Sequence, residues 1–94
     1  MSDYVERENY TEHDWYSEAR GLESAGDLEG ALAAFDESIK INPKYEKSWY
    51  YKAELLYKMG RMEEALECAK KVMEIKPSWK KHFEKNMPDL KIED

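Results

Sequence analysis

The sequence predicts an all-α protein built as a stack of helical hairpins, and two observations support this fold class. The first is an internal repeat of 34 residues without a gap, in which at least ten residues recur. They include Trp15, Tyr16, Ala19, Leu22, Gly26, Glu29, Ala31, Leu32, Ile41 and Pro43, repeated as Trp49, Tyr50, Ala53, Leu56, Gly60, Glu63, Ala65, Leu66, Ile75 and Pro77. A period of this length indicates stacked supersecondary units. The second is the recurrence of apolar residues every three or four positions, which is typical of helices.

The first helix of the first unit is predicted over residues 12–25, with its start and stop marked by particular residues. Residues 1–10 show no period, and we expect a flexible acidic N-terminal tail there. Thr11 and Asp14 have the spacing of a capping box. Trp15, Ala19 and Leu22 fall on one helix face.

A tight turn and a second helix complete the first unit, which we place at residues 11–45. Gly26 suits the left-handed conformation that commonly ends a helix, and Asp27 is a good N-cap for the next one. That helix should run over 28–41 with a broad apolar stripe. Asn42-Pro43 should end it, because a residue that precedes proline is disfavoured in the helical region.

The second unit, at residues 46–79, repeats this plan and is followed by a shorter segment. Helices are predicted over 47–59 and 62–75, with a turn at Gly60-Arg61 and a stop at Lys76-Pro77. We expect Ser78 to cap a fifth helix over 78–87 that closes the stack and ends at Pro88. Residues 88–94 are predicted to be a polar C-terminal tail.

Composition and charge exclude several classes of function. The chain has 94 residues and a net charge of −6, which argues against nucleic-acid binding through phosphates. Residues 1–43 carry eleven acidic and three basic side chains, and residues 44–94 carry ten and twelve. No run approaches the roughly 20 apolar residues of a membrane span, and the N-terminus does not read as a secretory signal. The single cysteine, Cys68, favours a reducing cytoplasm.

These repeated residues resemble the tetratricopeptide repeat family. The family pattern places a Trp early in the first helix, then a small residue, a large apolar residue, a Gly at the turn, Ala-Leu and an aromatic in the second helix, and a closing Pro. In the first unit these are Trp15, Ala19, Leu22, Gly26, Ala31, Leu32, Phe35 and Pro43, and in the second they are Trp49, Ala53, Leu56, Gly60, Ala65, Leu66 and Pro77. Glu18 and Lys52 stand where the family usually has Leu, and Ala69 replaces the aromatic. The resemblance implies a right-handed α-solenoid of two repeats, with a fifth, capping helix.

The resemblance also implies a function, because in this family the first helices line a concave groove that receives peptides. We therefore expect a protein-interaction module or scaffold that binds a peptide or partner surface. The residues at matching groove positions are His13, Tyr16, Ser17, Arg20, Lys47, Tyr50, Tyr51, Glu54, Tyr57, Lys81 and Lys85. Spacing agrees for Tyr50, Glu54 and Tyr57, which share one helix face turned away from the core stripe. Tyrosine gives a large contact area at low entropic cost.

One possible ligand is an acidic C-terminal peptide. Some relatives hold the C-terminal carboxylate of chaperone tails with a clamp of Lys, Asn and Arg on three successive first helices. The matching positions here hold Tyr16 and Arg20, then Tyr51, then Lys81 and Lys85. The two lysines fit that pattern and the other residues do not. An acidic C-terminal peptide is therefore a weaker hypothesis than a peptide or partner surface in general.

A structural role is the alternative, with weak homo-oligomers formed through the ends of the stack. The acidic first part of the chain, its lysine-rich end and the terminal Ile92-Glu93-Asp94 would permit head-to-tail or tail-in-groove association. Two repeats are also fewer than the three or so that usually make a stable stack, so a partner surface could supply the missing burial. A third possibility is that the chain is a fragment of a larger repeat protein.

Catalysis, cofactor binding and metal binding receive little support from the sequence. His13 and His82 are expected on helices at opposite ends of the stack, which argues against a shared metal or catalytic site. Cys68 has no companion histidine and reads as a small packing residue. The four glycines do not form a phosphate-binding loop, because no Lys-Ser/Thr follows them. We therefore expect no enzymatic activity, no metal and no cofactor.

Overall fold

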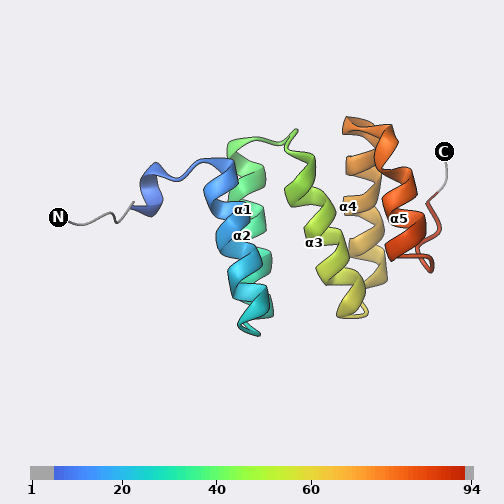
Figure 1. Ribbon diagram of the computed structural model, residues 1–94, viewed down its shortest axis with the longest axis horizontal. Helices are drawn as coiled ribbons and strands as arrows, with labels where there is room; N and C mark the ends of the chain where they lie inside the picture. Colours follow the sequence, from blue (N-terminus) through green and yellow to red (C-terminus); the bar gives the residue numbers. More distant parts are fainter. Residues whose placement is uncertain (1–5, 93–94) are drawn as a thin grey trace.

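The computed structural model describes residues 6–92, and that part of the chain forms two antiparallel helical hairpins and one further helix in a row (Figure 1). Its α-helices are α1 (Glu12–Ser24), α2 (Leu28–Ile41), α3 (Glu46–Lys58), α4 (Met62–Ile75) and α5 (Lys80–Asn86). Two short 3-10 helices are η1 (Arg7–Asn9) and η2 (Pro77–Trp79). Residues 6–92 contain no β-strand. The predicted all-α hairpin stack with five helices is confirmed.

The predicted helix starts and turns of the first unit are present as hydrogen bonds and backbone angles. The Asp14 amide donates to the Thr11 hydroxyl at 3.2 Å, and the Thr11 amide donates to the Asp14 carboxylate at 2.9 Å. Asp27 accepts a hydrogen bond from the Gly30 amide at 3.0 Å. Gly26 and its counterpart Gly60 have φ of 89° and 80°, a region that favours glycine. Capping side chains therefore mark the helix starts of the first hairpin, and a glycine with positive φ forms the turn of each hairpin.

The fifth helix differs from its prediction at its start. Residues 77–79 form η2, and α5 begins only at Lys80 without a side-chain cap. Pro77 lies in the first turn of η2, where its fixed φ suits a tight turn and its missing N–H costs nothing. Ser78 thus lies inside this turn, and the prediction that it caps the helix is wrong.

Small residues allow the two helices of each hairpin to approach closely. Ala19 and Ala31 in the first hairpin, and Ala53 and Ala65 in the second, are completely buried. Side chains at the contact set the distance between packed helices, so alanines at these points bring the backbones together. The repeated alanines are therefore the positions that define the hairpins.

A polar contact joins three helices inside this apolar core. The buried Ser38 hydroxyl on α2 donates to the Glu12 carbonyl on α1 at 2.7 Å. It also lies 2.6 Å from the buried hydroxyl of Ser48 on α3. Because a hydroxyl has one hydrogen, Ser38 uses it on Glu12 and must accept from Ser48. This chain of two hydrogen bonds fixes the first hairpin against the second.

Side chains next to both ends of the stack cover its apolar surface. At the first end, the Tyr10 ring lies 5.0 Å from the Trp15 ring, edge to face, and Arg7 pairs with Glu18 at 2.7 Å. At the other end, Met87 and Leu90 are buried. Residues 7–10 and 87–92 are therefore packed segments, which differs from the expectation of two plain tails. Residues 1–5 and 93–94 of the predicted tails lie outside the described residues.

The serine pair yields a stability prediction with a built-in control. Ser38→Ala leaves Ser48 without an acceptor and the Glu12 carbonyl without its side-chain donor, so it should lower the free energy of unfolding by about 1–3 kcal/mol. Ser48→Ala leaves the bond from Ser38 to Glu12 in place and should cost about 1 kcal/mol or less. Urea unfolding followed by circular dichroism measures both. Equal losses would show that the assigned direction of the hydrogen bonds is wrong.

Candidate functional site on the face of α1, α3 and α5

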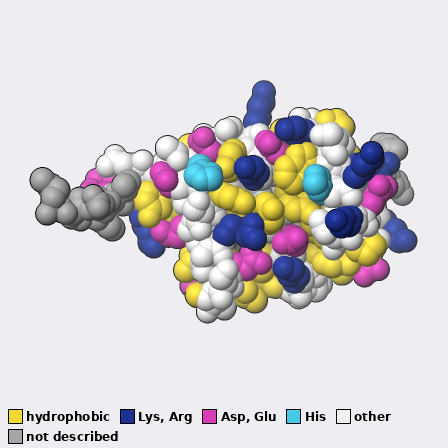
Figure 2. Space-filling view, viewed as in Figure 1, with side chains coloured by type: hydrophobic (Ala, Val, Ile, Leu, Met, Phe, Trp, Pro, Cys, Tyr) yellow, Lys and Arg dark blue, Asp and Glu magenta, His cyan; other side chains and the backbone are white. Residues whose placement is uncertain are grey.

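The first helices α1, α3 and α5 lie side by side on one face of the stack, with α2 and α4 behind them (Figure 1). Figure 2 shows this face, where hydrophobic side chains form a band across the helices with charged side chains on both sides. We call it the A face. It carries the positions that the sequence predicts for peptide contact.

An arginine and two tyrosines form the centre of the A face at the junction of α1 and α3. The Arg20 guanidinium lies 4.0 Å from the centre of the Tyr51 ring, within cation–π distance. Its Nη1 also donates to the Tyr16 hydroxyl at 3.3 Å, and the rings of Tyr16 and Tyr51 are 5.7 Å apart. All three side chains are half-buried, so they present fixed aromatic and cationic surface to solvent.

Below this centre, acidic and basic groups pair only loosely. The Lys58 ammonium lies 3.9 Å from Glu23 and 3.6 Å from Glu54, and Arg20 lies 3.8 Å from Glu23. Glu23 Oε1 is buried and has no hydrogen-bond partner among the described residues. Ion pairs at these distances, whose basic partners Arg20 and Lys58 stay exposed to solvent, add little stability. These groups can therefore take new partners at small cost. Lys58 was not among the predicted site residues, although its i+4 spacing from Glu54 is a signal for this pair.

A second group of side chains surrounds His13 at the N-terminal end of α1. His13 Nδ1 is 2.9 Å from the Tyr45 hydroxyl, and its ring lies 5.7 Å from that of Tyr16. Ser17 Oγ is 3.5 Å from His13 Nε2, and both side chains are exposed, as is Lys47 at the start of α3. Tyr45 precedes α3 and shows no helical period in the sequence, so sequence reasoning did not place it in this group.

The α5 end of the A face is basic. Lys81 and Lys85 are exposed one turn apart, and neither has an acidic group within 4 Å in residues 6–92. Close to them, the His82 ring lies 4.8 Å from the Trp79 ring. These two lysines, which the sequence predicts as groove residues, are separated from Arg20 by α3 (Figure 1).

Two of the predicted groove tyrosines are in contact with η2, α5 or the residues that follow α5. Tyr50 is only 3% exposed, because the rings of Trp79 and Phe83 pack 4.8 and 4.9 Å from its own. Its hydroxyl accepts a hydrogen bond from Asn86 at 2.8 Å. The expectation that Tyr50 lies open on the groove is therefore wrong. Tyr57 is half-buried, and its hydroxyl donates to Asp89 at 2.9 Å.

The described residues contain no cluster of metal ligands, and their cysteine is buried. Residues 6–92 contain no group of three or more His, Cys, Asp or Glu side chains placed to hold a metal ion. Burial raises the pKa of the Cys68 thiol to about 11, so it stays protonated near neutral pH. Within the same residues, no helix has the length and apolar character needed to cross a membrane.

The fold and its A face define a helical-repeat protein whose first helices form one continuous surface. A family model described as tetratricopeptide repeat matches residues 22–82, more than half of the chain. The chain therefore belongs to the tetratricopeptide repeat family, whose members are in general protein–protein interaction modules. No curated protein and no solved structure matches the chain.

Burial of Tyr50 yields a prediction about stability and pH. Tyr50→Ala removes a ring from the core and should cost about 3–5 kcal/mol, whereas Tyr50→Phe keeps the ring and should cost about 1 kcal/mol or less. Burial raises the pKa of the Tyr50 phenol above its ordinary value of 10.0. A pKa raised in the folded state adds stability below pH 10 that is lost as pH rises through the folded value.

The unaltered chain should therefore lose stability above pH 10 more steeply than Tyr50→Phe. Urea unfolding between pH 8 and 11 measures the difference, with neutral pH as the reference for both chains. Parallel curves for the two chains would contradict the assignment of Tyr50 to the core.

Proposed function

We propose that this protein is an interaction module that binds a peptide or a partner surface through the A face, chiefly at the junction of α1 and α3. The observation that supports this most directly is the cluster of Arg20, Tyr16 and Tyr51, which is preformed and still half exposed. Arginine and tyrosine are enriched among the residues that carry binding energy at interfaces. Their mutual contacts reduce the side-chain freedom that binding would otherwise remove.

The surroundings of this cluster suit a segment with exposed main-chain groups. Arg20 and Lys58 offer N–H donors, and Glu23 and Glu54 offer carboxylate acceptors, all within one part of the A face. An extended peptide needs both donors and acceptors along its length. The loose pairing of these groups lets them exchange partners when a peptide arrives.

The alternative, self-association through the ends of the stack, gains no separate support. Tyr10 covers Trp15 at one end, and Leu90 packs at the other, so both ends are already partly filled by the chain itself. We further infer that the module acts in the cytoplasm without catalysis, cofactor or metal. The single buried cysteine fits such a reducing environment.

A matched pair of substitutions tests the proposed function. Ser17→Arg places a long side chain at an exposed position of α1, beside His13 and three residues before Arg20. Ala33→Arg adds the same side chain at an exposed position of α2, in the cleft between α2 and α4. A partner captured from the source cell and then purified should bind Ser17→Arg at least tenfold more weakly and Ala33→Arg with unchanged affinity. Isothermal titration calorimetry measures both affinities.

Circular dichroism serves as the control that both variants keep their helices. Equal binding by both folded variants would exclude the A face between α1 and α3 as the site. Loss of binding in Ala33→Arg alone would instead assign the partner to the cleft between α2 and α4.

A further inference from the structure

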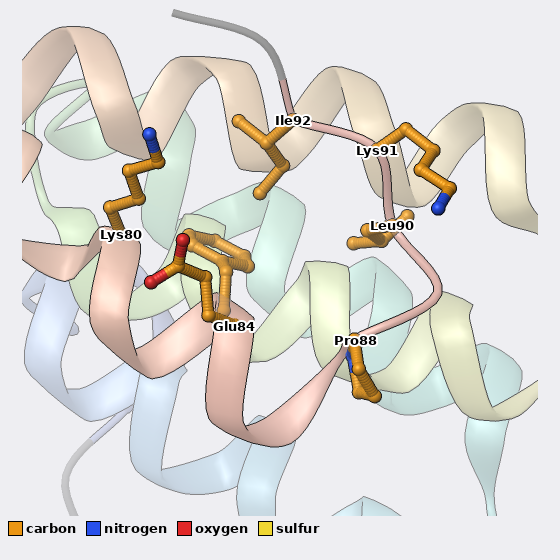
Figure 3. A pocket seen from close by; sticks show the side chains of 7 residues that line it. Lys80, Glu84, Pro88, Leu90, Lys91 and Ile92 are labelled. Atoms are coloured by element: carbon orange, nitrogen blue, oxygen red, sulfur yellow. The ribbon is translucent and has the colours of Figure 1, made fainter.

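A pocket lies at the α5 end of the stack, between this helix and the residues that follow it. Its volume is about 270 Å³, and Phe83 of α5 lines it together with Leu90 and Ile92. Figure 3 shows the segment after Pro88 running back past α5, with Leu90 and Ile92 pointing into the pocket and Lys91 pointing away. The segment thus inserts alternate side chains, as an extended peptide does in a binding groove.

Contacts beside the pocket hold the same segment through its acidic residue. Asp89 accepts a hydrogen bond from the Tyr57 hydroxyl of α3 at 2.9 Å. The Leu90 amide donates to the Met87 carbonyl at 3.1 Å, which closes a turn just after α5. Leu90 is 9% exposed, and Ile92 packs against the core less completely. The side chains of Asp89, Leu90 and Ile92 therefore hold the segment in place.

We propose that this end of the stack is a binding site for an extended protein segment of the pattern Asp, apolar, any residue, apolar. The chain's own residues 89–92 (DLKI) fill it as an internal ligand. A partner with the same pattern takes their place, with its carboxylate on the Tyr57 hydroxyl and its apolar side chains against Phe83.

Two features favour exchange of this segment. Its described part contributes no helix or strand, so its release breaks no regular hydrogen-bond ladder. The pocket also keeps open volume beside Leu90 and Ile92, which a partner with larger apolar side chains would fill. Charge favours an acidic partner here, because α5 carries Lys80, Lys81 and Lys85 against the single acidic residue Glu84.

A peptide supplied in trans tests the proposal. The probe is residues 87–92 (MPDLKI) with blocked ends, and the chain variant is Leu90→Ser with Ile92→Ser, which removes both apolar anchors of the internal segment. Nuclear magnetic resonance titration should show saturable shifts of the Phe83 and Glu84 amides in this variant. The unaltered chain should bind the peptide at least tenfold more weakly, because its own segment competes at high effective concentration.

Two control peptides define the pattern. A peptide with serine in place of both apolar residues (MPDSKS) should bind neither chain. A peptide with asparagine in place of the aspartate should bind the variant several-fold more weakly than MPDLKI, because a hydrogen bond to a charged acceptor is the stronger one. Equal affinity of MPDLKI for both chains would overturn the proposal, as would a folded variant that binds it no better than MPDSKS.

A second measurement covers the case in which the double variant loses its helices. In the unaltered chain, the Leu90 amide should exchange its hydrogen at least tenfold faster than the Cys68 and Val72 amides of α4, through local release of the segment. Equal exchange rates would show that the segment leaves only when the whole chain unfolds, and would overturn the proposal. Ser17→Arg should leave the peptide titration unchanged, which separates this site from the function proposed for the A face.

Discussion

The packing of Tyr50 beneath Trp79 and Phe83 determines which surfaces of this protein are available. A stack of two hairpins leaves the outer side of its last hairpin open, and apolar surface there must be covered. Here the covering rings come from η2 and α5 and lie within 5 Å of the Tyr50 ring. This contact sets the place of α5 and of the segment after it. It also removes Tyr50 from the A face and brings Asp89 within reach of Tyr57.

The same requirement at the other end of the stack explains a departure from the family pattern. Glu18 stands where the family usually has Leu. A leucine at this position would expose an apolar side chain at the end of the stack. The Glu18 carboxylate instead binds Arg7 at 2.7 Å and the Tyr10 hydroxyl at 3.0 Å, which holds η1 over Trp15. Lys52 is a similar case, since it binds Asp36 at 2.6 Å beside the cleft between α2 and α4. Both departures replace apolar packing with ion pairs at positions that solvent can reach.

The sequence predicts the hairpins well because their signals are local and, apart from the capping side chains of the first unit, occur twice. Capping residues, turn glycines and the apolar period each act within a few positions, and the helix bounds of α2 and α4 agree with those predicted. The covering segments occur once and have no period, so Tyr10, Leu90 and Ile92 carry no comparable signal. Tyr50 was misplaced for a related reason: spacing identifies its helix face, but whether that face is open depends on what packs against it from later in the chain.

Tyr16 and Tyr50 show why a repeated residue need not keep a repeated role. They are equivalent in the two units, yet Tyr16 is half-buried and shares Arg20 with Tyr51, whereas Tyr50 is enclosed by rings from η2 and α5. The difference arises from the next element in the stack: α3 presents a tyrosine to α1, and α5 presents Phe83 to α3. Tyr50 is thus part of the core at the contact between the second hairpin and α5. At the junction of α1 and α3, Arg20, Tyr16 and Tyr51 stay partly exposed while they contact one another, and a partner that binds aromatic and cationic groups would meet this cluster there.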